Sequence, residues 1–402
     1  MTELVRDSLD HCVKCTICET ACPYSRVTPL FPGPKYVGPQ AERYRGTGPS
    51  VDFSVDYCSG CGICTQVCPQ GVKIAEINAQ ARNKLKRQKG VPLRDRIITR
   101  PTWLGRAGTP AAKIANWTID KRPLRILGEK LLKVHRDAPA PDFAGRRFSR
   151  WARKHSSPKT GRKVVYFHGC GTEYYEPEEG EKVVAILEHN GFEVEVPKQD
   201  CCGLPLQSSG LFDDARKVVL RLARALAPHV RDGSIIVGNA TSCTVMLKRE
   251  AREILSLEDD PDLKLVSERT YDICELLLEL HDRGELKTDF RPVPEKIAYH
   301  APCQQQGHGI GKPALDLFAL IPELEVVEMD ARCCGIAGTY GLKQEKYEIA
   351  MAVGADLFGQ VAASGADTVA CDSETCRWQI SHATDRPSVH PIDLLHRAYG
   401  LS

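Results

Sequence analysis

Short apolar runs alternate with amphipathic patterns of helical period through the second half of the chain. Apolar runs within residues 163–170, 192–196 and 234–243 predict three strands, and the pattern over 212–227 predicts a helix. The same series of patterns returns over residues 296–303, 324–329, 342–361 and 367–376. Strands that alternate with helices of this length form right-handed βαβ units, so each series predicts an α/β unit with a parallel sheet.

Cysteines occur at matching places in the two series and indicate a duplicated unit. Their offsets are 133, 132 and 133 residues, and they pair Cys170 with Cys303, Cys201–Cys202 with Cys333–Cys334, and Cys243 with Cys376. Each lies at or just after the end of a predicted strand. Because sites in open α/β sheets form at the carboxyl ends of strands, we expect the cysteines of each repeat to face one shared crevice.

The first 160 residues follow a different pattern. Prolines and glycines over 28–39 predict a largely non-helical segment, and helices are expected over 40–45 and 74–86. Repeated prolines between residue 82 and about 160 predict short helices without an independent core. The predicted fold is α+β and α/β, with a ferredoxin-like helical module over 1–81, a connecting segment over 82–162, and two tandem α/β Cys-Cys-Gly repeats over 163–290 and 291–402.

Length and composition fit a globular protein of two or three domains. The chain has 402 residues, of which 42% are hydrophobic. No stretch approaches 18 uninterrupted apolar residues, and Met1–Asp10 has no apolar signal-peptide core. We therefore expect no transmembrane helix and no secretion, and a reducing cytoplasm suits a chain with 18 cysteines that must act as thiolates.

The formal net charge of +2 hides a strongly basic segment. Residues 82–163 contain 24 Lys and Arg against 5 Asp and Glu, together with Trp103, Trp117 and Trp151. Basic residues with interleaved tryptophans favour contact with an anionic membrane surface or an acidic partner. A solvated linker between the two halves of the molecule is the alternative, and we expect no nucleic acid as a partner.

Two cysteine runs near the N-terminus carry the clearest chemistry. Both have the spacing C-x2-C-x2-C-x3-C followed by proline, which is the two-cluster ferredoxin pattern. In this pattern three thiolates lie on one loop and the fourth comes from the other run, whereas zinc favours C-x2-C pairs set well apart. We therefore expect two [4Fe–4S] clusters, one held by Cys12, Cys15, Cys18 and Cys68, the other by Cys58, Cys61, Cys64 and Cys22.

The repeat cysteines are candidates for further clusters or metal ions. A vicinal pair strains a disulfide but suits a metal or cluster edge, and the glycine after each pair lets the backbone approach closely. Buried structural cysteines are the alternative. One candidate site comprises Cys170, Cys201, Cys202 and Cys243, and the other Cys303, Cys333, Cys334 and Cys376, with Cys371 as an additional candidate. Cys274 has no counterpart in the other repeat and is expected to be a core thiol.

Five sequence runs give the chain a resemblance to a known family. They are Cys12–Cys18, Pro32–Lys35, Cys201–Pro205, Cys333–Gly341 and Glu374–Ile380. On these runs, and along almost its whole length, the chain resembles the iron–sulfur subunits of anaerobic glycerol-3-phosphate dehydrogenases. More distantly, it is similar to the Cys-Cys-Gly subunits of heterodisulfide reductases, glycolate oxidases and D-lactate oxidation systems.

The resemblance implies a non-catalytic electron-transfer subunit. In that family, flavoprotein-side subunits of the A and B type oxidise sn-glycerol 3-phosphate. The iron–sulfur subunit attaches them to the cytoplasmic face of the membrane and relays electrons toward menaquinone. No flavin is expected on this chain, since no Gly-x-Gly-x-x-Gly motif follows a strand. The alternatives are an iron–sulfur subunit of a glycolate or D-lactate oxidase and a heterodisulfide-reductase-like enzyme.

Two positions depart from the full Cys-Cys-Gly pattern, which ends in Cys-x-x-Cys. Ala240 replaces the earlier cysteine of that pair in the first repeat, and Ser373 replaces it in the second, where the nearest cysteine is displaced to 371. In the heterodisulfide reductase relatives the full pattern supplies five thiolates to a noncubane cluster. The departures therefore count against a disulfide-cleaving site. Three histidines near the strand ends could ligate metal, pass protons or be structural: His168, His300 and His308.

Overall fold

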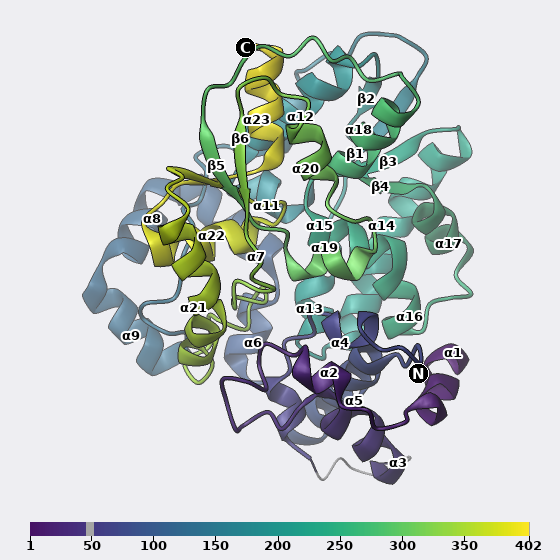
Figure 1. The fold of residues 1–402 in the computed structure, drawn as a ribbon, viewed down its shortest axis with the longest axis vertical. Coiled ribbons are helices and arrows are strands. Elements are labelled where there is room, and N and C mark those ends of the chain that lie inside the picture. The colour runs from purple at the N-terminus through teal and green to yellow at the C-terminus, as the bar shows by residue number, and fades with distance from the viewer. Residues whose placement is uncertain (46–51, 402) are drawn as a thin grey trace.

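The N-terminal module consists of short helices and loops and ends in one long helix. The computed structural model describes residues 1–45 and 52–401. Figure 1 shows the module at the bottom of the molecule, in purple. Its helices are α1 (Glu3–Asp7), α2 (Ile17–Thr20), α3 (Ala41–Arg45), α4 (Ile63–Gln66) and α5 (Ile74–Lys89). The predicted helices over 40–45 and 74–86 are thus confirmed, the second being three residues longer.

The prediction of a non-helical segment over 28–39 is wrong at its C-terminal end. Helical backbone begins at Pro34, and a π-helical turn over Tyr36–Gln40 leads into α3. Proline at the start of a helix loses no hydrogen bond, because its N–H would have no partner there. Pro39, which lies further on in this helical stretch, is accommodated by a kink at Gly38, whose φ and ψ are −92° and −106°.

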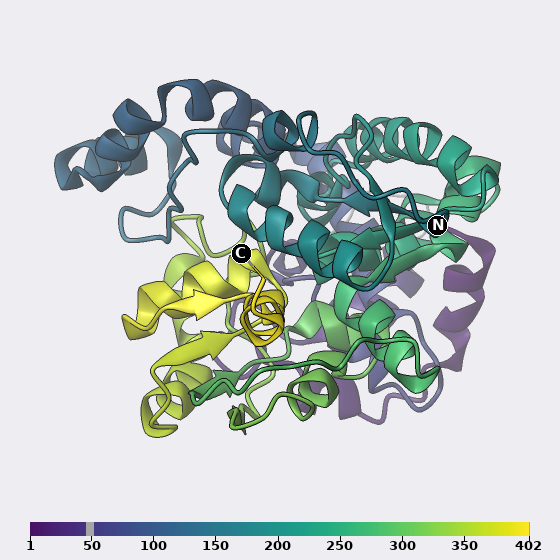
Figure 2. The same ribbon diagram turned by 90° about the horizontal axis from the view of Figure 1, so that it is seen from above.

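The connecting segment forms short helices, as predicted. They are α6 (Leu93–Ile98), α7 (Pro101–Gly108), α8 (Ala112–Asp120), α9 (Arg122–Leu132) and α10 (Phe148–Ala152). Beyond α5, only three of its apolar side chains are buried, and one of these, Phe148, belongs to the core of the repeats. Figure 2 shows α8 and α9, in blue at the upper left, extending beyond the rest of the molecule.

Each repeat is built on a four-stranded sheet. The strands of the first repeat are β1 (Lys163–Phe167), β2 (Glu193–Glu195), β3 (Ile235–Gly238) and β4 (Thr270–Asp272). Its helices are α11 (Gly169–Tyr174), α12 (Pro177–His189), α13 (Leu204–Ser208), α14 (Phe212–Arg231), α15 (Thr241–Val245), α16 (Ala251–Leu255), α17 (Pro261–Glu268) and α18 (Ile273–Asp282).

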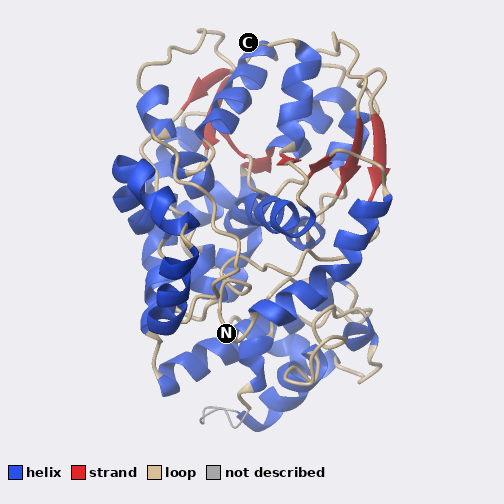
Figure 3. Ribbon diagram, turned by 90° about the vertical axis from the view of Figure 1, so that its left-hand side faces the viewer, coloured by secondary structure: helices blue, strands red, loops and turns tan. Residues whose placement is uncertain are grey.

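The second repeat follows the same order with fewer helices. Its strands are β5 (Lys296–Tyr299), β6 (Glu325–Glu328), β7 (Thr368–Ala370) and β8 (Ser388–Val389). Its helices are α19 (Cys303–His308), α20 (Pro313–Phe318), α21 (Tyr347–Ala363), α22 (Glu374–Thr384) and α23 (Pro391–Tyr399). Figure 3 shows the two sheets in red among the helices.

The two sheets have the same topology, which confirms the duplication and the parallel sheets. Their strand orders are β2-β1-β3-β4 and β6-β5-β7-β8, and every neighbouring pair is parallel. An equivalent buried hydrogen bond recurs in both repeats. The Tyr166 hydroxyl donates to Asn239 Oδ1 at 2.9 Å, and the Tyr299 hydroxyl donates to Asp372 Oδ2 at 2.8 Å.

The predicted helix over 342–361 starts too early. Residues 342–346 form turns, and α21 begins at Tyr347. Two lysines of this turn are buried and reach acids far away in the sequence. Lys343 Nζ lies 3.2 Å from Asp95 Oδ1, and Lys346 Nζ lies 3.2 Å from Asp56 Oδ2. These contacts join the second repeat to the N-terminal module and the connecting segment.

The two repeats pack against each other through one common core. This core combines residues of both sheets, such as Tyr166 and Tyr299, with apolar side chains of α12, α18, α20 and α23. Arg377 of α22 is 3% exposed and crosses between the repeats, where it pairs with Glu176 and with Glu179 at 2.5 Å. The repeats therefore form a single body on which the cysteines are fixed relative to one another.

Candidate metal centres

The two N-terminal cysteine runs fold into loops of the same backbone conformation. Lys14 and Thr16 have positive φ values of 61° and 69° in the first loop. Gly60 and Gly62, at the equivalent positions of the second loop, have φ values of 77° and 82°. These left-handed residues curl each loop around its thiols. Non-glycine residues in this conformation are strained and cluster at functional sites, which fits a ligand loop.

The structure groups the eight thiols of the module in the crossed manner expected from the spacing. Burial raises the pKa of Cys18 to about 11, and its thiol neighbours are those of Cys12, Cys68 and Cys15. Burial also raises the pKa of Cys64 well above its usual value, with Cys61, Cys58 and Cys22 as neighbours. Such groups of four sulfur donors suit a [4Fe–4S] cluster, whose iron replaces the protons that burial would otherwise retain.

The cysteines of each repeat also converge. In the first repeat, Cys170, Cys201, Cys202 and Cys243 form a chain of sulfur contacts, with Cys202 Sγ lying 3.2 Å from Cys243 Sγ. In the second, Cys303, Cys333, Cys334 and Cys376 do the same, and Cys334 Sγ lies 3.1 Å from Cys376 Sγ. The structure thus brings together the four thiols of each predicted set.

The Cys-Cys-Gly turn favours the thiolate form of its first cysteine. Contacts from Cys170 and Cys202 lower the pKa of Cys201, and those from Cys303 and Cys334 lower the pKa of Cys333. The N–H groups of the two glycines donate to these sulfurs at 3.4 Å and 3.3 Å. Both glycines have positive φ, 85° at position 203 and 87° at 335, and this conformation turns the N–H toward the sulfur.

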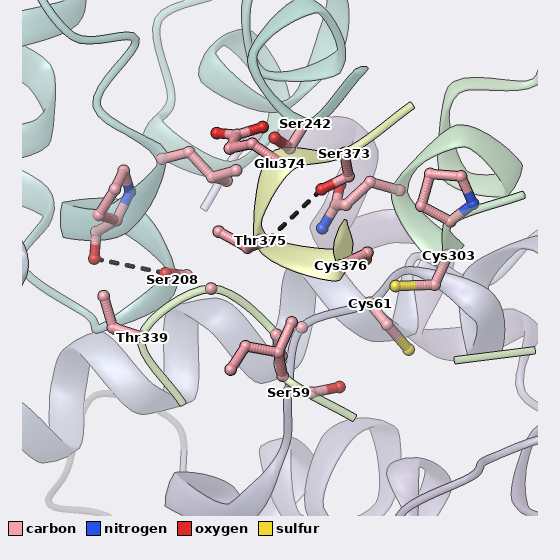
Figure 4. Close-up of a pocket in the computed structure, with 18 of the residues that line it drawn as sticks. Ser59, Cys61, Ser208, Ser242, Cys303, Thr339, Ser373, Glu374, Thr375 and Cys376 are labelled. Atoms are coloured by element: carbon pink, nitrogen blue, oxygen red, sulfur yellow. Dashed lines mark hydrogen bonds between the residues drawn. The ribbon is translucent and has the colours of Figure 1, made fainter. Parts of the chain in front are cut away.

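One cavity connects three cysteine sets. It has a volume of about 100 Å³, and thiols of both repeats line it together with Cys61 of the N-terminal module. Figure 4 shows Cys61, Cys303 and Cys376 gathered at one side of this cavity. Cys61 has Cys333 among its thiol neighbours, and Cys303 has Cys61. The expected crevice exists, and it is shared by both repeats and the module, which the sequence did not indicate.

The departures from the full cysteine pattern lie at equivalent places. Ala240 and Ser373 each precede the first turn of a helix, α15 and α22 respectively. Ser373 lines the cavity. Cys371 does not line it, although its thiol contacts that of Cys376. Cys274 is fully buried in the common core, as expected, beside the carboxyl groups of Asp272 and Asp372.

The three histidines have different surroundings. His168 is buried, with Nδ1 2.8 Å from the carbonyl oxygen of Gly169. His300 is fully buried and contacts the Cys376 thiol. His308 lies away from the sulfur atoms, and burial beside Lys248 and Arg249 lowers its pKa to about 3. Only His300 therefore touches a cysteine of the candidate sites.

Two residues near the sulfur atoms, Tyr24 and Glu374, were not predicted from the sequence to belong to the site. Tyr24 is buried beside Cys333 and Cys61, and its hydroxyl donates to the carbonyl oxygen of Gly335 at 2.9 Å. Glu374 lines the cavity, and burial raises its pKa to about 6. Tyr24 and Gly335 lie 311 residues apart in the sequence, so only the folded structure reveals their contact.

Comparison with known families and proteins agrees with this arrangement. Residues 8–72 match the family of 4Fe-4S dicluster domains, and residues 164–248 and 297–381 each match the family of cysteine-rich domains called CCG. The fold and the sites therefore define an iron–sulfur protein with a dicluster module and two CCG domains. No helix among residues 1–45 and 52–401 is long and apolar enough to span a bilayer.

Comparison with individual proteins shows which family of iron–sulfur proteins the chain belongs to. The chain is 37% identical to the C subunit of the anaerobic glycerol-3-phosphate dehydrogenase of Escherichia coli K12, over 97% of this chain and 98% of the relative. It is 28% identical to lactate utilization protein A 1 of Bacillus mycoides, over 60% of this chain and 96% of that protein. It is 29% identical to the B subunit of the fumarate reductase (CoM/CoB) of Methanothermobacter marburgensis, over 59% and 45% respectively. The chain belongs to the family of anaerobic glycerol-3-phosphate dehydrogenase C subunits.

Proposed function

We propose that the chain is the electron-transfer subunit of a membrane-associated glycerol-3-phosphate:quinone oxidoreductase. It accepts electrons from flavoprotein subunits of the A and B type and passes them toward menaquinone at the cytoplasmic face of the membrane. It does not itself oxidise the substrate. The near full-length similarity to a C subunit supports this assignment over a glycolate oxidase, D-lactate oxidase or heterodisulfide-reductase-like role. The similarity to lactate utilization protein A 1 and to the fumarate reductase (CoM/CoB) B subunit covers 60% and 59% of the chain.

The observation that carries the proposal is the continuity of the sulfur sets. Cys15 is exposed, whereas three of the four thiols in the neighbouring set, among them Cys64, are buried. Cys61 of that neighbouring set then shares a cavity with Cys303 of the second repeat and Cys170 of the first. The donor sets therefore form one line from the surface into the repeats, which is the arrangement an electron-transfer protein needs.

We propose the following ligands. Cys12, Cys15, Cys18 and Cys68 hold one [4Fe–4S] cluster, and Cys58, Cys61, Cys64 and Cys22 hold the second. The four-cysteine sets of the repeats hold further iron–sulfur or metal centres. Bound clusters of this kind exchange single electrons. The chain itself buries the sulfur atoms and directs the N–H groups of Gly203 and Gly335 toward them, and such burial and hydrogen bonding tune a reduction potential.

Helices α8 and α9 support the proposed membrane contact. They pack against each other and expose large apolar side chains, among them Ile114 (70% exposed), Trp117 (57%) and Leu131 (72%). Exposed lysines accompany them, such as Lys113 and Lys130. A helix pair with exposed apolar and basic side chains suits the interface of an anionic bilayer, where apolar groups insert and cations meet lipid head groups.

Substitution of Cys15 by alanine tests the electron-transfer role. In the complex with its flavoprotein subunits, Cys15→Ala should abolish reduction of quinone by glycerol 3-phosphate. Reduction of a dye that takes electrons directly from the flavoprotein should persist. Cys274→Ala is the control, since that thiol lies in the common core and does not line the cavity that the donor sets share. Unchanged quinone reduction in Cys15→Ala would refute the relay, and loss of dye reduction would place this chain in substrate oxidation.

A further inference from the structure

A second cavity lies on the other side of the thiols of the first repeat. It has a volume of about 360 Å³, and Cys170 and Cys201 form part of its wall. The rest of the wall comes from α7, from α10 and the residues beside it, from α11 and the residue before it, and from the loop over 196–200 that follows β2. Among the residues that the structure describes, the connecting segment and the first repeat line this space, and the N-terminal module and the second repeat do not.

Four cations converge on this cavity. They are Arg106, Arg147, Arg153 and Lys198. Within residues 1–45 and 52–401, none of the four forms an ion pair with a carboxylate. Arginine and lysine side chains usually find such partners when they are gathered in one place, because like charges repel one another. A cluster of four unpaired cations therefore indicates that the counter-charge comes from outside the chain.

The two acidic residues of the cavity wall, Glu173 and Asp200, already have partners within the chain. Glu173 accepts hydrogen bonds from the backbone N–H and the hydroxyl of Ser149, at 2.9 Å and 2.8 Å. Asp200 pairs with Arg221 outside the cavity at 3.3 Å and accepts the N–H of Cys201 at 2.9 Å. Arg221 thus balances Asp200, and Glu173 is the one remaining acid among the described residues of the wall that opposes the four cations, so the cavity keeps a net positive charge.

Close helix packing sets the position of the first of these cations. Gly105 of α7 lies against the ring of Tyr174, and a β-carbon at this position would stand 2.2 Å from Tyr174 Cγ. Glycine therefore allows α7 to approach α11 and places Arg106 at the cavity, where its side chain also bonds the Tyr174 hydroxyl. The guanidinium of Arg147 lies 5.7 Å from the centre of the same ring. Tyr174 thus holds two of the four cations in place.

We propose that this cavity binds a phosphate group carried by a small organic molecule. Guanidinium groups bind phosphate through paired hydrogen bonds, and lysine adds a point charge, so three arginines and one lysine match a phosphomonoester dianion. The volume of about 360 Å³ leaves room for an organic part beside the phosphate. Two sources share this chemistry, a soluble phosphate ester and the head group of an anionic phospholipid.

Calorimetric titration of the cluster-loaded full-length chain tests the proposal. The probes are glycerol phosphate and a short-chain phosphatidic acid below its micellar concentration, at constant ionic strength. Saturable binding of at least one probe is expected, and the double variant Arg153→Glu/Lys198→Glu should weaken it at least about tenfold, because two favourable charges become unfavourable. Both side chains are exposed and have no ion-pair partner among the described residues, so their reversal leaves the fold intact.

Control variants distinguish binding in this cavity from a general effect of the protein's surface charge. Lys264→Glu reverses an exposed charge on α17, outside the cavity wall, and should leave the affinity unchanged. Arg106→Gln provides a second test that removes one cation without adding an acid. Preference for glycerol phosphate would assign a soluble ester, and preference for phosphatidic acid a lipid head group. Absence of saturable binding of both probes to the wild-type chain, or equal weakening by Lys264→Glu, would overturn the proposal.

Discussion

Alanine substitution at the two Cys-Cys-Gly glycines offers a comparison within one molecule. Both glycines have nearly the same positive φ, 85° at position 203 and 87° at 335. Their surroundings differ. A β-carbon at 335 would lie 1.9 Å from the backbone oxygen of Ala350 in α21, whereas one at 203 would meet the Val219 side chain at 3.0 Å. Gly335→Ala must therefore displace a helix backbone, and Gly203→Ala only a side chain.

The magnitudes follow from these contacts. An L-residue in the left-handed conformation costs about 1–2 kcal/mol, and both variants carry this term. Forcing an extra carbon into packed structure costs about 1–3 kcal/mol more, and this second term applies mainly to Gly335→Ala. We therefore expect Gly335→Ala to lower the free energy of unfolding by about 1–3 kcal/mol more than Gly203→Ala does.

Urea denaturation under anaerobic conditions, followed by circular dichroism, measures the difference. We expect a lower midpoint for Gly335→Ala than for Gly203→Ala, and a lower midpoint for both than for the wild-type chain. Equal midpoints for the two variants would refute the argument from the Ala350 contact. A wild-type midpoint for both would refute the argument from the positive φ values as well.

Three further predictions concern the buried carboxyl group of Glu250, the ion pairs of Arg377, and membrane binding by α8 and α9. Burial raises the pKa of Glu250 from 4.5 to about 7, so the folded chain keeps a proton that the unfolded chain releases, and stability falls as the pH rises from about 4.5 to about 7. Glu250→Gln should therefore stabilise the chain by up to about 3 kcal/mol at pH 8 and by much less at pH 5, in urea titrations at both values. Arg377→Gln leaves the partly exposed side chain of Glu176 and the buried side chain of Glu179 without their cation. It should cost about 3–5 kcal/mol in the same assay, and a neutral effect would contradict the bridging role. Ile114→Asp/Leu131→Asp should abolish salt-sensitive co-sedimentation with anionic liposomes, whereas Tyr44→Asp, at a side chain 89% exposed in the N-terminal module, should not.

Local pattern and spacing were enough to predict much of the fold. The constant cysteine offset predicted the duplication, and the C-x2-C-x2-C-x3-C spacing predicted which thiols of the N-terminal module come together. The fourth strand of each sheet was not predicted, because β4 has three residues and β8 two, too few for a hydrophobic pattern. The domain boundaries after residues 81, 162 and 290 stay predictions.

The parts that sequence could not predict depend on contacts between distant segments. The turn over 342–346 has the residues of a helix, yet its lysines bind Asp95 and Asp56 and hold it in another conformation. The shared cavity depends on α4 meeting α19, where Gly307 approaches the backbone of Cys61. The sequence pattern within either segment does not predict this contact. The helix over 34–39 likewise depends on a contact with a distant segment, the packing of Gly38 against Asn78 of α5.

The iron content of the anaerobically purified chain shows whether electron-transfer centres continue from the N-terminal module into the repeats. Two [4Fe–4S] clusters in the N-terminal module account for about eight irons, so a line of iron–sulfur centres that continues into the repeats predicts clearly more than eight per chain. Cys334→Ala should then remove part of the excess and leave about eight irons or more. A wild-type value of about eight, unchanged in Cys334→Ala, would contradict the claim and confine electron transfer to the N-terminal module.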